Sequence, residues 1–358
     1  MPNWPLAPTQ CLILSRAALG NILAKSPSVD RRSFVQQILK TAFQNVSGKS
    51  SRSSDEARSH FELQAKRTDG NYCLTSGGDK TIKLWNPHRD NCGLLLKTYS
   101  GHGYEVLDAR SSHDNAQIAS CGTDKQVLLW DVETGRILRK FRGHAGCVNA
   151  IAFNKDSSVV ISGSLDGTVR AWDAKGRGQH PIQVMDEASD SVTSVSCSAH
   201  EILTGSADYH VRRYDLRQGM FYSDYLGKTV SSVNFSKDGQ CVLASCLDST
   251  VRLMEKGKGQ LLTESVLCIF SRHTFTGHTN VEYKTDSSFF NSDRQVVSGS
   301  EDGKVYCWNL LGKEVLYTLN HPVPFVIASV SVHPEIECLL SACRGNAYLW
   351  KNVDALAS

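Results

Sequence analysis

The sequence predicts an all-β protein in which seven copies of one unit form a seven-bladed β-propeller. The first observation is a repeated phrase, complete as "SGSLDGTVRAWD" at residues 162–173 and found in weaker form six more times. The second is spacing, because a large residue closes each copy at intervals of 40–54 residues. The third is that five of the six tryptophans occupy this closing position. The closing residues are Trp85, Trp130, Trp172, Tyr214, Met254, Trp308 and Trp350.

Four short runs in each unit have the character of strands. "VNAIAF" and "VSSVNF" alternate apolar and polar residues, and "SVVISG" and "QVVSGS" are short β-branched runs. "TVRAW" and "TIKLW" alternate again, while Asn, Asp and Gly separate the runs. Four strands in a repeat of roughly 40–45 residues are typical of a propeller blade.

The repeats occupy residues 61–352, between an atypical N-terminal extension (1–60) and a short tail (353–358). The extension is serine-rich and basic, with Asp30 as its one acid up to Ser54. This composition also fits an organelle transit peptide. In "DRRSFVQQILKTAF" (30–43), an Asp cap and an apolar stripe predict one helix. That helix either docks a partner or lies on the ring.

A closed ring requires a strand from the N-terminal extension. Eight residues follow Trp350, too few for an outer strand, so an N-terminal strand must complete the last blade and remove its open edge. We expect this strand within 8–17 or 56–67; the alternative is a strained or open seam. The interval from Met254 to Trp308 is also about twelve residues too long, and we assign the surplus to 264–275.

Composition excludes several function classes. The net charge of +3 gives no basic surface for nucleic acid, and no apolar run is long enough to cross a membrane. None of the twelve cysteines form a Cys-x-x-Cys pair, so we expect reduced core thiols and no metal site. Without clustered carboxylates or a Gly-rich phosphate loop, the sequence predicts no cofactor and no enzyme.

The units resemble WD40 repeats, because three of them open with Gly-His and two close with Trp-Asp. In WD40 proteins a chain of hydrogen bonds joins this histidine, a second-strand serine, the turn aspartate and the closing tryptophan. The resemblance implies three such structural tetrads, in which buried polar groups satisfy one another. They are His102–Ser120–Asp124–Trp130, His144–Ser162–Asp166–Trp172 and His278–Ser298–Asp302–Trp308.

Each tetrad contains the residue types of a hydrolase triad. Three equivalent copies placed between strands offer no single exposed nucleophile, however, so the sequence predicts no catalytic residue. The other four units lack the opening Gly-His, and we expect packing alone to hold them. The fifth and seventh are expected to be the weakest.

Several longer segments of the sequence resemble one family of WD40 proteins, the mitogen-activated protein kinase organizer 1 or WD repeat domain 83 family. The resemblance rests on "LKTYSGHGYEVLDA", "RKFRGHAGCVNAIAFN", "SAHEILTGSADYHVRRYDLRQG" and "SEDGKVYCW", in order along residues 69–308. It implies a non-catalytic scaffold for the kinase cascade that ends in extracellular signal-regulated kinase. It also implies an association with the spliceosome and with an oxygen-sensing prolyl hydroxylase. The N-terminal extension and the 264–275 surplus depart from the family.

Partners are expected on the face that carries the loops before the first strand and between the second and third strands. We predict protein partners, no membrane or direct nucleic-acid contact, and a cytoplasmic and nuclear monomer within larger complexes. The candidate partner-binding residues of these loops are Tyr104, Glu105, Thr123, Leu165, Ala207, Leu247 and Glu301.

One alternative function is specific. "YDLR" (214–217) resembles the Trp-Asp-x-Arg box of propellers that act as substrate receptors in cullin-RING ubiquitin ligases. Arg217 would then contact the ligase adaptor through a charge-assisted hydrogen bond. Tyr214 stands in place of the usual tryptophan, and a locally paired arginine is the simpler interpretation.

Overall fold

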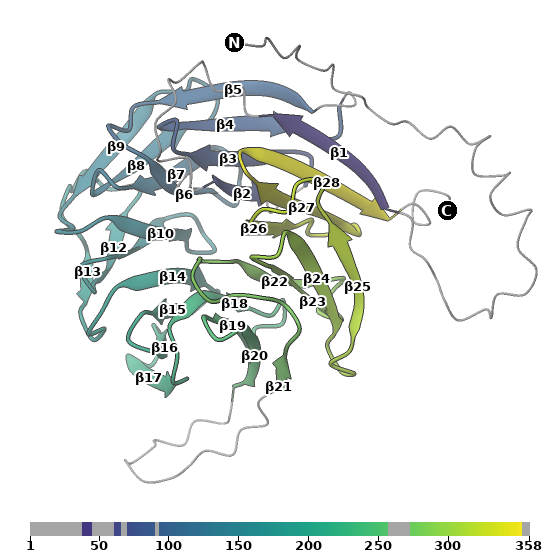
Figure 1. Ribbon diagram of the computed structural model, residues 1–358. Helices are drawn as coiled ribbons and strands as arrows, with labels where there is room; N and C mark the ends of the chain where they lie inside the picture. The colour runs from purple at the N-terminus through teal and green to yellow at the C-terminus, as the bar shows by residue number, and fades with distance from the viewer. Residues whose placement is uncertain (1–37, 45–60, 66–69, 90–92, 257–272, 353–358) are drawn as a thin grey trace, which may run out of the picture. The chain divides into compact units, whose positions relative to one another are not determined.

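The computed structural model describes residues 38–44, 61–65, 70–89, 93–256 and 273–352, with side chains for 70–89, 93–256 and 273–351. Residues 40–351 form one compact unit, and the other unit is represented among the described residues by Ile38, Leu39 and Asn352 alone. Every regular element of the described residues is a β-strand. The strands form seven four-stranded sheets, which confirms the predicted seven-bladed propeller (Figure 1).

The first three blades follow the predicted repeat, each a meander whose neighbouring strands are antiparallel. Blade 1 contains β2 (Phe61–Ala65), β3 (Cys73–Gly77), β4 (Thr81–Asn86) and β5 (Leu94–Ser100). Blade 2 contains β6 (Val106–Ser111), β7 (Gln117–Gly122), β8 (Gln126–Asp131) and β9 (Ile137–Arg142). Blade 3 contains β10 (Val148–Phe153), β11 (Val159–Ser164), β12 (Val169–Asp173) and β13 (Gln183–Met185).

The next three blades repeat this order. Blade 4 contains β14 (Val192–Cys197), β15 (Glu201–Ser206), β16 (His210–Asp215) and β17 (Met220–Tyr225). Blade 5 contains β18 (Val230–Phe235), β19 (Cys241–Cys246), β20 (Thr250–Glu255) and β21 (His273–Phe275). Blade 6 contains β22 (Ser287–Phe290), β23 (Gln295–Gly299), β24 (Lys304–Asn309) and β25 (Val315–Asn320).

Blade 7 is built from both ends of the chain. It contains β26 (Ile327–Val332), β27 (Cys338–Cys343), β28 (Asn346–Asn352) and β1 (Ile38–Gln44), with β1 hydrogen-bonded to β28 as the outer strand. An N-terminal strand therefore completes the last sheet, as ring closure requires. Figure 1 shows β1 beside β28, far from β1 in the sequence.

The closing strand comes from neither segment that we expected. Residues 8–17 lie outside the described residues, and within 56–67 the structure describes β2, which is the inner strand of blade 1. Residues 38–44 also form strand where the apolar stripe predicted helix, while 30–37 lie outside the described residues. The stripe was a weak guide because pairing with a sheet edge overrides the helical preference of a short segment.

The extra segment between Met254 and Trp308, predicted as residues 264–275, is also shorter than predicted. Its last three residues, His273–Phe275, form β21 and pair with β20, with Phe275 opposite Val251. These residues belong to the blade because every sheet needs a fourth strand to cover its outer edge. The rest of the 264–275 segment lies outside the described residues.

The core lies between neighbouring sheets. Each described apolar cluster contains residues of two adjacent blades. Between blades 2 and 3, for example, Phe141 of β9 stacks on Trp172 of β12 with ring centroids 5.4 Å apart. Face-to-face packing of this kind makes every blade depend on its neighbours.

Candidate protein-interaction site

Blades 2 and 3 contain the hydrogen-bond chain that the sequence predicted. In blade 3, the Trp172 indole N–H donates to Ser162 Oγ (2.8 Å), and His144 Nε2 lies 2.8 Å from the same oxygen. His144 Nδ1 lies 3.0 Å from Asp166 Oδ2. In blade 2 the equivalent distances are 2.8, 2.7 and 2.8 Å, for Trp130–Ser120, His102–Ser120 and His102–Asp124.

Protonation in blade 3 follows from burial and hydrogen bonding. Burial lowers the pKa of His144, and the nearby Asp166 opposes this only in part. A neutral His144 accepts from the Ser162 hydroxyl at Nε2 and donates to Asp166 from Nδ1. Burial raises the pKa of the Asp166 carboxyl, but hydrogen bonds from Thr168, Ala145 and His144 outweigh it and hold the pKa well below its usual range. The carboxylate is therefore ionised and fully satisfied.

This chemistry is structural. The Ser120 and Ser162 hydroxyls are fully buried, and the tryptophan and histidine of their own blade occupy both. A nucleophile must reach a substrate, and these oxygens have no route to one.

The third predicted tetrad is not formed. Trp308 Nε1 donates to Thr276 O (3.0 Å), and Ser298 Oγ donates to Gly299 O (3.0 Å). Tyr306 stands four residues after Asp302, where blade 2 has Leu128, and its hydroxyl donates to Asp302 Oδ2 (2.7 Å). Asp302 therefore accepts a hydrogen bond from Tyr306 of its own hairpin and not from His278.

His278 is buried beside this rearranged network. Among the described residues neither ring nitrogen has a hydrogen-bond partner, and the ring lies edge-on to Trp308 with centroids 5.3 Å apart. Burial lowers the pKa of His278 to about 4, because the nearby acids oppose it only in part. The imidazole is therefore neutral at physiological pH.

Packing is not all that holds blades 1, 4 and 5, contrary to the expectation. In each, a cation four residues after the turn aspartate forms an ion pair with it, as Lys83–Asp79 (2.6 Å), Arg212–Asp208 (2.6 Å) and Arg252–Asp248 (2.5 Å). The signal was readable as Asp-x-x-x-Lys or Asp-x-x-x-Arg in "DKTIK", "DYHVR" and "DSTVR". A strand period of two places such a pair on one face.

Blade 7 contains a histidine network that the Gly-His motif did not predict. His321 Nε2 lies 2.8 Å from Ser341 Oγ, and the Trp350 indole N–H donates to the same oxygen (2.7 Å). The signal was Asn-His at residues 320–321. The turn position has Arg344 in place of aspartate, and its guanidinium carbon lies 5.3 Å from the centroid of the Phe325 ring. The seventh blade therefore has three of the four tetrad members.

The candidate partner-binding residues differ in exposure. Tyr104 and Leu165 are 63% and 55% exposed. Glu105, beside Tyr104, and the turn residues Thr123, Ala207 and Leu247 of blades 2, 4 and 5 are half-buried. Arg217 has a side chain that is 63% exposed, with its Nε 3.8 Å from Asp215. Exposed aromatic and branched apolar side chains are the stronger candidates for protein contact.

Glu301 lies in the turn between β23 and β24 and holds a neighbouring loop in place. Its Oε1 accepts from the backbone N–H groups of Val281 (2.8 Å), Glu282 (2.7 Å) and Tyr283 (2.9 Å). The carboxylate therefore fixes the loop before β22 and leaves Val281 and Tyr283 exposed on it. Glu301 is a positioning residue for that loop.

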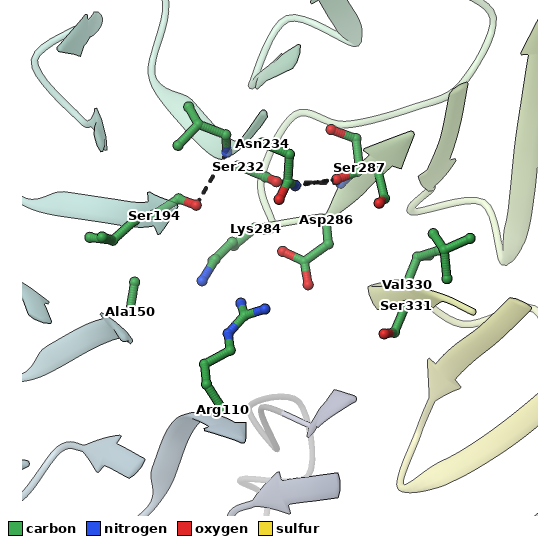
Figure 2. Close-up of a pocket in the computed structure, with 14 residues that line it drawn as sticks. Arg110, Ala150, Ser194, Ser232, Asn234, Lys284, Asp286, Ser287, Val330 and Ser331 are labelled. Atoms are coloured by element: carbon green, nitrogen blue, oxygen red, sulfur yellow. Dashed lines mark hydrogen bonds between the residues drawn. The ribbon is translucent and has the colours of Figure 1, made fainter. Parts of the chain in front are cut away.

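The inner strands enclose a polar cavity of about 130 Å³. Figure 2 shows Arg110, Lys284 and Asp286 pointing toward one another within it. Burial raises the pKa of Asp286, against the effect of Lys284 and Arg110, while Arg110 Nε lies 2.9 Å from Asp108 Oδ1. Two cations thus face two carboxylates.

Polar side chains of the inner strands also join neighbouring blades. Ile151 N–H donates to Asp108 Oδ2 (3.0 Å), Val233 N–H to Ser194 Oγ (3.2 Å) and Ser287 N–H to Ser232 Oγ (3.4 Å). Asn234 donates to Ser287 O (2.6 Å), as the dashed line in Figure 2 shows. The polar lining of the cavity therefore contributes to ring stability.

Comparison with known proteins gives the family. A model of the WD domain, G-beta repeat, matches residues 67–86, 93–131, 135–173, 221–254 and 270–309. WD repeat domain-containing protein 83 of Homo sapiens is 52% identical over 284 residues, 79% of this chain and 85% of that protein. The protein of that name from Rattus norvegicus is 51% identical with the same coverage. A Dictyostelium discoideum homolog is 32% identical over 298 residues, 75% of this chain and 86% of its own length.

Within the described residues, no helix has the length and apolarity needed to cross a bilayer.

The repeat match and the identity over most of the chain agree with the seven sheets and their buried turn networks. The chain belongs to the WD repeat domain-containing protein 83 family, whose WD40 propellers are protein-interaction scaffolds.

Proposed function

We propose that this chain is a non-catalytic scaffold that assembles components of a mitogen-activated protein kinase cascade, in the cytoplasm and nucleus. The carrying observation is the 51–52% identity to WD repeat domain-containing protein 83 over most of the chain. The resemblance of segments along residues 69–308 to the kinase-organizer family supports it further. A rigid ring with several exposed loops suits this task, because separate partners can occupy separate blades.

Co-purification tests this proposal. Tagged full-length chain should recover at least two kinases of one cascade in a single complex, as a monomer within the larger assembly. The double variant Tyr104→Ala with Leu165→Ala should recover less, while a Lys155→Ala control on another turn recovers the same amount. Purified protein that binds no kinase of the cascade contradicts the proposal. A truncation at residue 61 is unsuitable, because it removes the closing strand β1.

A role in pre-mRNA splicing is a second activity of the same scaffold. It is supported by the family resemblance and predicts nuclear co-fractionation with small nuclear ribonucleoproteins. Fractionation of nuclear extract with tagged full-length chain measures this. Absence of the chain from ribonucleoprotein fractions contradicts it.

A substrate-receptor function in a cullin-RING ubiquitin ligase is favoured by one observation. The Arg217 side chain is exposed at the turn between β16 and β17, where Asp215 Oδ1 accepts from the Arg217 backbone N–H (2.9 Å) and fixes the turn. Capture of the ligase adaptor by wild type and its loss in Arg217→Ala would support this function. Equal capture by both, or none by either, removes it.

A further inference from the structure

The loop face of blades 1 to 3 carries a group of exposed cations around one exposed tyrosine. We call Lys80, Tyr104, Lys125, Arg142 and Leu165 the basic-aromatic surface. All five are exposed. Lys80 Nζ lies 5.5 Å from the centroid of the Tyr104 ring, a cation–π distance.

Hydrogen bonds and one close sulfur–oxygen contact connect this surface across three blades. The Thr123 N–H donates to Glu105 O (3.0 Å), next to Tyr104. The Cys147 thiol lies 3.9 Å from Thr123 O, and the Leu165 N–H donates to Cys147 O (2.8 Å). The chain of contacts thus runs from blade 1 to Leu165 in blade 3.

Register places the remaining cations within this surface. Arg142 pairs with Gln126, the residue after Lys125, so both cations lie at the same end of blade 2. Lys125 in turn lies two residues after Thr123, which is part of the contact chain. The five residues therefore lie in neighbouring turns at the same end of blades 1 to 3.

The neighbouring carboxylates leave a positive balance. Asp79 pairs with Lys83. Asp166 keeps its negative charge because His144 is neutral, and the nearby cation is Arg170, whose Nε donates to Thr168 Oγ1 (3.2 Å) beside that carboxylate. Among the described residues Lys125 and Arg142 have no carboxylate partner. Glu105 and Asp124 are the acids of these loops that have no lysine or arginine partner among the described residues, against the three exposed cations Lys80, Lys125 and Arg142. The surface therefore attracts negative charge although the whole chain is nearly neutral.

The two lysines also stand at a conformationally costly position. Lys80 and Lys125 have φ of 64° and 61°, in the left-handed region. Blades 3 and 6 have Gly167 and Gly303 at the equivalent place, which is the less strained choice. Blades 4 and 5 have Tyr209 and Ser249 there, with φ of 72° and 60°, so the position accepts several side chains and is a lysine in blades 1 and 2, which carry this surface.

We propose that the basic-aromatic surface binds an extended acidic segment of a partner protein. Its carboxylates pair with Lys80, Lys125 and Arg142, and an apolar side chain between them packs on Tyr104 and Leu165. The exposed acids Asp186, Glu187 and Asp190 of blade 4 repel the same segment and confine it to blades 1 to 3. This inference rests on the proposed scaffold function and specifies the partner for this part of the face.

Fluorescence anisotropy tests the proposal with full-length chain and a fluorescein-labelled peptide of alternating glutamate and leucine. Binding should weaken as salt rises, and a peptide with glutamine in place of glutamate should bind at least about tenfold more weakly. The double variant Lys80→Glu with Lys125→Glu should lose about tenfold in affinity. The matched control is Lys155→Glu with Lys237→Glu, in the turns at the other end of β11 and β19.

Equal binding by both double variants, or equal binding of the glutamate and glutamine peptides, would overturn the proposal. Tighter binding of poly-uridine at the same lysines would also overturn it and assign the surface to nucleic acid. Unchanged melting temperatures show that loss of binding is not unfolding. Kinase recovery is measured separately. If the chain binds the peptide but recovers no kinases, the scaffold function alone is contradicted. If it recovers kinases but does not bind the peptide, the proposal for this surface alone is contradicted.

Discussion

Blades 3 and 4 satisfy the same turn aspartate in two ways. In blade 3, Asp166 accepts from His144, which comes from the loop before the blade and continues to Ser162 and Trp172. In blade 4, Asp208 pairs with Arg212 from its own sheet, and Arg212 also donates to Ser206 (2.6 Å). The first network ties a loop to the blade, and the second stays within one hairpin.

The difference teaches that the aspartate is the constant requirement and its partner is exchangeable. Burial raises the pKa of both Asp166 and Asp208, and hydrogen bonds or charge outweigh that effect in both. A buried carboxylate must be satisfied, but either a neutral imidazole with backbone donors or a guanidinium can do so. Losing the aspartate should have unequal effects, because the partner left behind is neutral in blade 3 and charged in blade 4.

Asp208→Ala should have the largest effect. It leaves the guanidinium of Arg212, 5% exposed, without its carboxylate, and an unpaired buried charge costs about 3–5 kcal/mol of unfolding free energy. Chemical denaturation measures the loss. Asp208→Ala with Arg212→Met should recover part of it, since the stranded cation is gone. A single variant as stable as wild type would show that this ion pair does not support blade 4.

Asp166→Ala should cost less, about 2–3 kcal/mol, because the groups left behind are neutral. The donors that lose their acceptor are His144, Thr168 and the Ala145 backbone, and the last two lie close to solvent. Asp166→Asn keeps part of the acceptor capacity, so its free energy of unfolding should lie between those of wild type and Asp166→Ala. The comparison between blades is contradicted if Asp166→Ala is more destabilising than Asp208→Ala.

The sequence predicted the ring but not all of its contacts. Recurrent closing residues and Gly-His sites were sufficient for seven blades and for the networks at His102 and His144. The spacing Asp-x-x-x-Arg also indicates the arginine pairs, but the Gly-His motif does not predict them. The sequence did not show which side chain would hydrogen-bond to Asp302. Both Tyr306 and His278 are suitable, and the structure shows that Tyr306 forms the bond.

The same limit applies to the ends of the ring and to its loops. Strand pairing with β28 decided the state of residues 38–44, and a local apolar stripe does not contain that information. The place of Glu301 in the turn also did not indicate that its carboxylate accepts from three backbone N–H groups of the loop before β22. Both outcomes depend on residues distant in the sequence.

Blade 6 extends the comparison to pH. The pKa of His278 is lowered by burial to about 4 in the folded chain, below its usual value near 6.5, so folding disfavours protonation. Stability is therefore complete above about pH 6.5 and is lost as pH falls toward 4, by about 2 kcal/mol at pH 5. The control His278→Leu should flatten this slope in denaturation series at several pH values. An unchanged slope would show that another group causes it.

Leu165→Ala should have the smallest effect on stability and so separates the two roles of one turn. Leu165 is 55% exposed beside Asp166, so its truncation should change the free energy of unfolding by less than about 0.5 kcal/mol. Its effect should appear in partner binding, because an exposed branched side chain on the loop face is free to contact another protein. Paired measurements of melting temperature and partner capture for Leu165→Ala and Asp166→Ala decide this. A stability loss from Leu165→Ala as large as that from Asp166→Ala would mean that both residues are structural, and the site would then have to lie elsewhere on the face.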